Sequence, residues 1–166
     1  MSLTTYCEYD EVRAALGVND LELKESVLSL PVYEMGLVRE LSKVSTSLNA
    51  IFSTVHSLDA ASRTVQEAGL HDAVRLFSVY AAAKQVGVSL ATFAPKDVGD
   101  GKATVSRFAG TPFLDTLERI DRFYTELRGS LVDAYEAYTG AATSLASTVP
   151  ATAFLASPRA YDPVTG

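Results

Sequence analysis

Apolar residues in the second half of the chain follow one another at alternating spacings of four and three, without a break. The series consists of Phe113, Leu117, Ile120, Tyr124, Leu127, Leu131, Ala134 and Tyr138. An α-helix of ~3.6 residues per turn brings such a series onto one face. Thr111 and Pro112 suit its first turn, and Gly140 suits its end. The sequence therefore predicts a helix over about 112–139.

Two earlier segments show the same periodicity. The first, 31–58, contains the series Leu37, Leu41, Val44, Leu48, Ile51, Val55 and Leu58. The second, 70–93, contains Leu76, Val79, Ala83, Val86, Leu90 and Phe93, with a second apolar strip of Val74, Phe77 and Ala81. Asp59 and Gly69 are expected to bound a short helix between them. These patterns predict an all-α fold, a bundle of three long helices.

Short helices are expected before the bundle. The segment 8–16 has the apolar spacing of a helix, and Gly17 stands where that helix would end. Asn19 and Glu22 have the spacing of a helix cap followed by an acidic first turn. The second short helix is expected to end before Pro31, because proline disfavours helical geometry in the residue that precedes it.

Two segments depart from the helical pattern. The first, 94–110, is rich in glycine and charge and is predicted to be a long projecting loop. Within it, 103–108 alternates as a short strand does, and we expect it to pair with a neighbouring subunit, because no partner is evident within the chain. The second, 140–166, is predicted to be an extended C-terminal arm, since three prolines forbid a long helix. The expected organisation is therefore a helical domain over 1–139 followed by this arm.

Both departing segments contain side chains typical of protein interfaces. Arginine and tyrosine are enriched at interface hot spots, and apolar side chains in an otherwise polar arm need a partner to cover them. On this basis we expect partner-binding residues, against the alternative of ordinary surface residues. The candidates are Arg107, Phe108, Phe154, Leu155, Arg159 and Tyr161.

Composition limits the classes of function. The 166 residues predict about one domain, and their single cysteine excludes a disulfide within the chain. The net charge of −6 disfavours a non-specific DNA clamp, which needs a basic face. The first residues lack the basic start of a signal peptide, and no stretch approaches the ~20 apolar residues that span a bilayer. We therefore expect a cytosolic product that does not enter membranes.

Catalytic and metal-binding patterns are weak. His71 follows Glu67 by four residues with Gly69 between them, whereas di-metal helical bundles use a spacing of three. Cys7 lies beside Glu8, which opposes formation of a thiolate, so a small buried apolar residue is the favoured interpretation. The glycines at 99–101 do not have the spacing of a phosphate-binding loop. The sequence predicts no catalytic, cofactor-binding or metal site, and hence no enzyme.

The opening of the chain resembles a known family. The residues 9–23, with the letters YDEVRAALGVNDLEL, form a short helix, a cap and a second short helix in the predicted order. This run resembles the start of the head-to-tail connector proteins of tailed bacteriophages, also called adaptor or head completion proteins. Those proteins continue with long amphipathic helices, a flexible loop and a C-terminal arm, as this chain is expected to do.

The resemblance implies a structural protein of the virion neck. Copies of the chain would form a ring, usually of twelve, under the portal, assembled in the host cytoplasm. The ring would join capsid to tail and continue the DNA channel, with no sequence-specific contact to DNA and no membrane. Its partners would be the portal, neighbouring copies of the chain, and a tail or neck protein on the other side.

Two alternatives remain at the level of sequence. Another phage neck or tail-completion subunit would show the same physical pattern with a different neighbour. A small helical enzyme or ligand-binding bundle would need a polar pocket with convergent titratable side chains.

Overall fold

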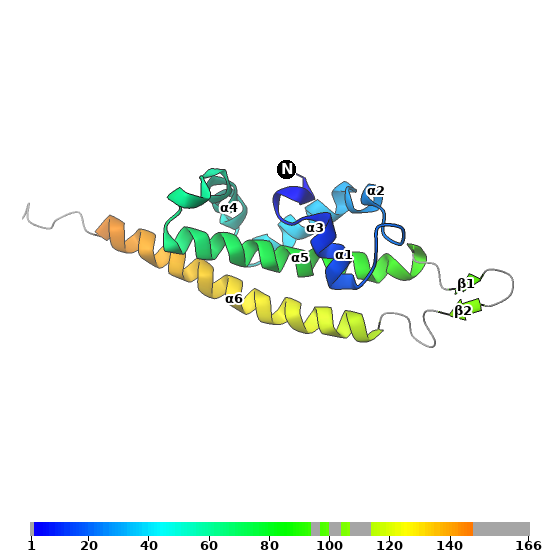
Figure 1. The fold of residues 1–166 in the computed structure, drawn as a ribbon. Helices are drawn as coiled ribbons and strands as arrows, with labels where there is room; N and C mark the ends of the chain where they lie inside the picture. The colour runs from blue at the N-terminus through cyan, green and yellow to red at the C-terminus, as the bar shows by residue number, and fades with distance from the viewer. Residues whose placement is uncertain (1, 94–96, 100–103, 107–113, 148–166) are drawn as a thin grey trace, which may run out of the picture.

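Two long helices form the spine of the molecule in the computed structural model. The structure describes residues 2–93, 97–99, 104–106 and 114–147, and the side chains of 2–89 and 114–140. Helix α5, Val65–Phe93, packs along α6, Leu114–Ser147 (Figure 1). The two run antiparallel, because Phe77 contacts Tyr124 and the later Lys84 pairs with the earlier Asp121. The all-helical prediction is confirmed for this core.

Shorter elements precede α5 in the chain. In chain order they are η1 (Leu3–Thr5), α1 (Tyr9–Leu16), α2 (Glu25–Leu28), α3 (Pro31–Ser42), α4 (Leu48–Ser57) and η2 (Ala60–Ser62). Helices α1, α3 and α4 each contact α5 (Figure 1). Helix α5 is therefore the central element, as its apolar residues on two sides indicate.

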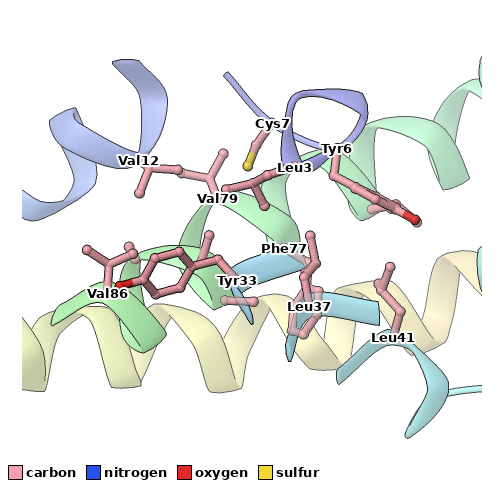
Figure 2. Close-up of a cluster of buried hydrophobic side chains, with 14 of the residues drawn as sticks. Leu3, Tyr6, Cys7, Val12, Tyr33, Leu37, Leu41, Phe77, Val79 and Val86 are labelled. Carbon is pink, nitrogen blue, oxygen red and sulfur yellow. The ribbon is translucent and has the colours of Figure 1, made fainter. Parts of the chain in front are cut away.

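One hydrophobic cluster joins the N-terminal elements, α3, α4, α5 and α6. Side chains from η1, α1, α3 and α5 meet in it (Figure 2). Its largest fully buried members are Tyr6, Phe52, Phe77, Leu16, Leu23, Leu28, Leu37, Leu41, Leu48, Leu70 and Ile120. Because each such side chain contributes ~1.5–3 kcal/mol through burial, the cluster is the main source of stability.

The first short helix forms as the sequence predicts. In α1, the Glu11 carboxylate accepts a hydrogen bond from the Glu8 backbone N–H at 2.8 Å, which completes a capping box. Gly17 ends the helix with a left-handed φ of 70°. The Asn19 side chain then accepts hydrogen bonds from the N–H groups of Leu21 and Glu22, both at 3.0 Å. The Asn19 hydrogen bonds thus cap a turn, and the helix expected to start at Asn19 is wrong, because α2 begins only at Glu25.

The single helix expected over 31–58 is wrong. Helix α3 ends at Ser42 and α4 begins at Leu48. Between them, Ser45 Oγ accepts a hydrogen bond from the Ser47 N–H at 3.3 Å. Ser45 and Ser47 also bond the Tyr135 hydroxyl of α6, at 2.9 and 3.1 Å. Serine side chains that bond nearby backbone compete with helical hydrogen bonds, which explains the break.

The boundary expected at Gly69 is also wrong. Helix α5 begins at Val65 and runs through Gly69 without interruption. A capping box starts it, because Thr64 N–H donates to the Glu67 carboxylate at 2.7 Å and Glu67 N–H donates to Thr64 Oγ1 at 3.2 Å. The short helix expected after Asp59 is reduced to the turn η2. Packing over the rest of α5 outweighs the ~1 kcal/mol that a glycine costs inside a helix.

Helix α6 is longer than the sequence predicts. It continues through Gly140 to Ser147, so the expected C-terminal arm, 140–166, begins inside a helix. The residues from Leu114 to Ser147 include no proline, and Gly140 does not have the left-handed φ with which Gly17 ends α1. The residues 148–166 lie outside the described part of the chain.

The alternating segment in the projecting loop finds its partner within the chain. Strand β2, Thr104–Ser106, pairs antiparallel with β1, Asp97–Gly99, with Val98 opposite Val105. The expected pairing with a neighbouring subunit is therefore corrected to a local hairpin. The hairpin lies beyond the C-terminal end of α5 (Figure 1).

Candidate interaction surfaces

The partner-binding residues expected from the sequence all lie outside the described residues. This holds for Arg107 and Phe108, which directly follow β2. It also holds for the residues of the C-terminal segment, Phe154, Leu155, Arg159 and Tyr161. Among the described residues, candidate surfaces lie in other parts of the chain, where the sequence predicts no partner-binding residues.

A polar cleft lies over the segment that carries the family resemblance. Its open volume is about 650 Å³, and charged side chains from α1 and the α1–α2 connection line it. Arg13 donates a hydrogen bond to the Leu23 carbonyl at 2.9 Å and pairs with Asp10 at 2.6 Å. Asn19 caps the turn that follows α1. These groups hold the connection in place, so the geometry gives them a structural role.

A second cluster joins α3, α5 and α6. The Tyr124 hydroxyl donates to Glu40 Oε2 at 2.7 Å, and Lys43 pairs with the same carboxylate at 2.6 Å. Lys84 lies 4.2 Å from the centre of the Tyr124 ring and pairs with Asp121. Burial raises the pKa of Glu40, but the hydrogen bonds from Lys43 and Tyr124 outweigh it and leave the pKa below its usual value.

The same cluster makes the Tyr124 hydroxyl a weaker acid than that of an ordinary tyrosine. Burial, followed by the hydrogen bond to Glu40, raises the pKa of Tyr124 to about 12. A neighbouring cavity of about 380 Å³ is lined by both lysines, yet each ammonium is already compensated by a carboxylate. The cluster therefore acts as a polar clamp between helices.

Four aromatic rings connect η1, α4 and α5. Tyr6 stacks on Phe52 with ring centres 5.3 Å apart, and Phe52 lies near both His56 and His71. His56 Nδ1 and His71 Nε2 are 3.3 Å apart, and His71 Nδ1 lies 3.2 Å from Asp72. Burial first, and then the charge of His71, lowers the pKa of His56.

The histidine pair was not foreseen. The sequence relates His71 only to Glu67, four residues earlier, whereas His56 lies on a different helix. Within residues 2–89 and 114–140, no group of three or more histidine, cysteine, aspartate or glutamate side chains has the arrangement of a metal site. The pair instead fastens α4 to the first turns of α5.

Cys7 is fully buried, as the sequence analysis expected. Burial, followed by the nearby Glu11 carboxylate, raises the pKa of the Cys7 thiol to about 12. A thiol with this pKa stays protonated near neutral pH and is a poor nucleophile.

A groove with apolar walls runs along α3. It has a volume of about 510 Å³ and is lined by Tyr6, Glu34, Met35, Val38, Arg39 and Asn49. The Tyr6 hydroxyl donates to the Asn49 side chain at its edge. Met35 is 70% exposed, and Val32, which precedes it by three residues on α3, is 60% exposed. We call Leu30, Val32, Met35 and this groove the α3 patch.

A second exposed apolar strip lies on α5 and α6. Leu76 is 50% exposed, although the sequence analysis placed it on the main buried face of its helix. Tyr80, one turn later, contacts Phe123 of α6 with ring centres 5.2 Å apart, and Phe123 is 38% exposed. Val65, 85% exposed, lies on the same side of α5 three turns earlier. We call Val65, Leu76, Tyr80 and Phe123 the α5 patch.

Comparison with known proteins supplies no family. No protein-family model matches the chain, and searches of curated proteins and of solved structures find no match. Among the described residues, no helix has both the length and the apolar character needed to cross a membrane.

Proposed function

We propose that this chain is a structural subunit of a phage neck that forms a ring under the portal. The ring joins capsid to tail and continues the DNA channel, as the resemblance of 9–23 to head-to-tail connectors implies. Its partners are the portal, neighbouring copies of the chain in the ring, and a tail or neck protein on the side away from the portal. In this proposal the protein has no enzymatic role.

One observation supports this function most directly. The two segments expected to bind partners leave the α5–α6 pair at its opposite ends. Phe93 and the hairpin mark one end, and Ser147, where α6 stops, marks the other (Figure 1). A subunit that joins two different components needs attachment points that are separated in this way.

The resembling segment also has a clear structural part in this fold. Val12 and Leu16 of α1 are buried against α5, and Gly17 and Asn19 set the direction of the chain that follows. Residues 9–23 thus fix the N-terminal elements to the central helix. Another neck or tail-completion protein would have the same geometry, and a different bound partner would identify it.

Removal of the residues after α6 tests the proposal. We expect the chain without 148–166 to lose binding to the portal from the same source, because the apolar and arginine side chains of that segment are the proposed contacts. The helical content and the midpoint of thermal unfolding should not change, since the deletion begins after Ser147. Co-sedimentation with the portal measures binding, and circular dichroism measures the fold.

A full-length control separates contact from chain length. In this variant Phe154, Leu155, Arg159 and Tyr161 are replaced by serine, and it should fail to bind as the truncated chain does. Full portal binding by the truncated chain would contradict the proposed role of the segment.

A further inference from the structure

The α3 patch and the α5 patch point in opposite directions from α5. Gly36 of α3 lies so close to Gln85 that a Cβ on it would meet the Gln85 side chain at 2.1 Å. Tyr33 likewise reaches Ser89 at 3.4 Å. Leu76 precedes Gln85 by nine positions, about two and a half turns at ~3.6 residues per turn, so it lies on the opposite side of α5. Helix α3 thus covers one side, and Leu76 is exposed on the other.

The two patches differ in shape. The α3 patch contains a groove of about 510 Å³ with Tyr6, Met35 and Val38 in its walls. The α5 patch is a row of protruding side chains, in which Leu76 and Phe123 flank Tyr80. Aliphatic and aromatic side chains that fill an apolar groove form the energetic centre of many protein interfaces.

Charges at the edges of the patches are complementary. Glu34 and Arg39 border the groove of the α3 patch. Asp72 lies one turn before Leu76 on α5, and its side chain is 82% exposed. When one patch meets the other, the exposed Asp72 carboxylate can approach the Arg39 guanidinium at the edge of the groove. Such matching at an interface edge favours one orientation over others.

We propose that the α5 patch of one copy docks into the α3 patch of a second copy. Because the two patches are different surfaces on opposite sides, the contact is head-to-tail, and repeating it generates a ring or a filament. This inference rests on the proposed function in one respect only, namely that the portal closes the series into a ring. The contact itself needs only two copies of the chain and forms without the portal.

Cysteine cross-linking of the purified chain tests the contact. Cys7 is buried, so introduced cysteines are the reactive thiols. A chain with both Met35→Cys and Leu76→Cys, treated with a flexible bis-maleimide, should give a ladder of dimers, trimers and larger products. Each single variant alone should remain monomeric, whereas a mixture of the two single variants should give dimers and nothing larger.

The matched control replaces Leu76→Cys by Val88→Cys. Val88 is 80% exposed on α5 but lies outside the α5 patch. Combined with Met35→Cys, it should give no ladder. Dimers from Leu76→Cys alone would show a symmetric contact and overturn the proposal, as would a monomeric Met35→Cys/Leu76→Cys chain at concentrations of hundreds of micromolar.

A second variant separates this inference from the proposed function. Leu76→Glu should abolish self-association, measured by sedimentation velocity, while leaving the binding of single subunits to the portal intact. Unchanged self-association of this variant would overturn the docking proposal alone. A cross-linked ladder together with absent portal binding would overturn the connector function and leave the docking contact standing.

Discussion

Single glycines show most clearly how local geometry sets the effect of a residue. Gly17 has a φ of 70°, a backbone conformation that side chains disfavour. Gly87 lies in close contact with Leu117, whose Cδ2 would be 2.4 Å from an added Cβ. Gly69 lies within α5 and has no atom within 4 Å of that position. The same residue type thus has three different structural roles.

These roles predict opposite effects of the same substitution. Gly69→Ala should raise the free energy of unfolding by about 0.5–1 kcal/mol, because alanine reduces the freedom of the unfolded chain and fits the helix. Gly17→Ala should lower it by about 1 kcal/mol through backbone strain, and Gly87→Ala should lower it through overlap with Leu117. Urea unfolding of the three variants measures these changes. A Gly17→Ala variant as stable as the unaltered chain would contradict the left-handed backbone at that residue.

At the scale of single residues, the sequence predicts the burial of some side chains correctly and that of others wrongly. Leu37 and Leu131 are buried as their helical spacing indicates, and Cys7 is buried as expected of a small apolar side chain. Leu76 is not, although it has the same spacing. Its side of α5 becomes exposed because α1 and α6 close over Gly87 but not over Leu76. Periodicity places Leu76 on a face of the helix, but it does not say which neighbour covers that face.

At the scale of elements, local hydrogen bonding decides where helices begin and end. The apolar spacing of Leu41, Val44 and Leu48 continues across the break between α3 and α4, so periodicity alone predicts one helix. The break depends on Ser45 and Ser47, which bond the backbone and Tyr135 of α6. A serine pair is a visible local signal, whereas its partner on α6 appears only in the folded chain.

The contact between α4 and α5 should depend on pH through His56. Burial and His71 lower the pKa of His56 in the folded chain below its usual 6.5. The unfolded chain therefore binds this proton at higher pH than the folded chain does. The contribution of neutral His56 to the stability of the folded chain is therefore present above about pH 6.5. It decreases as the pH falls through the lowered pKa.

Nuclear magnetic resonance of the histidine rings measures this effect. The titration midpoint of His56 should lie below 6.5. It should rise in the His71→Gln variant, because the neighbouring positive charge is removed. In the His56→Gln variant, the free energy of unfolding should decrease less than in the unaltered chain when the pH falls from neutral to about 5.5. A midpoint at or above 6.5 would contradict the lowered pKa and the close approach of the two rings.

At the scale of the whole molecule, the central helix organises everything else. Helix α5 contacts α1, α3, α4 and α6, and its exposed side carries Val65 and Leu76. The sequence predicts the helical class and the long C-terminal helix, since both depend on extended periodicity. It does not predict the two exposed patches, because they arise from how separate helices lie beside one another.

The proposed ring depends on two kinds of contact, which are made by different parts of the molecule. Contacts between copies involve the α3 and α5 patches on the sides of the α5–α6 pair. Contacts with the portal and the tail involve the segments that leave its two ends. This separation predicts that changes to the patches and changes to the segment after Ser147 have distinct effects on assembly.

Electron microscopy of the protein mixed with the portal from the same source tests the central claim most directly. We predict a closed ring with rotational symmetry beneath the portal, in which neighbouring copies meet through Leu76 and Met35. The mass of the protein alone, measured in parallel, should be that of a monomer or of weakly associated copies. A stable monomer that does not associate with the portal would contradict the account.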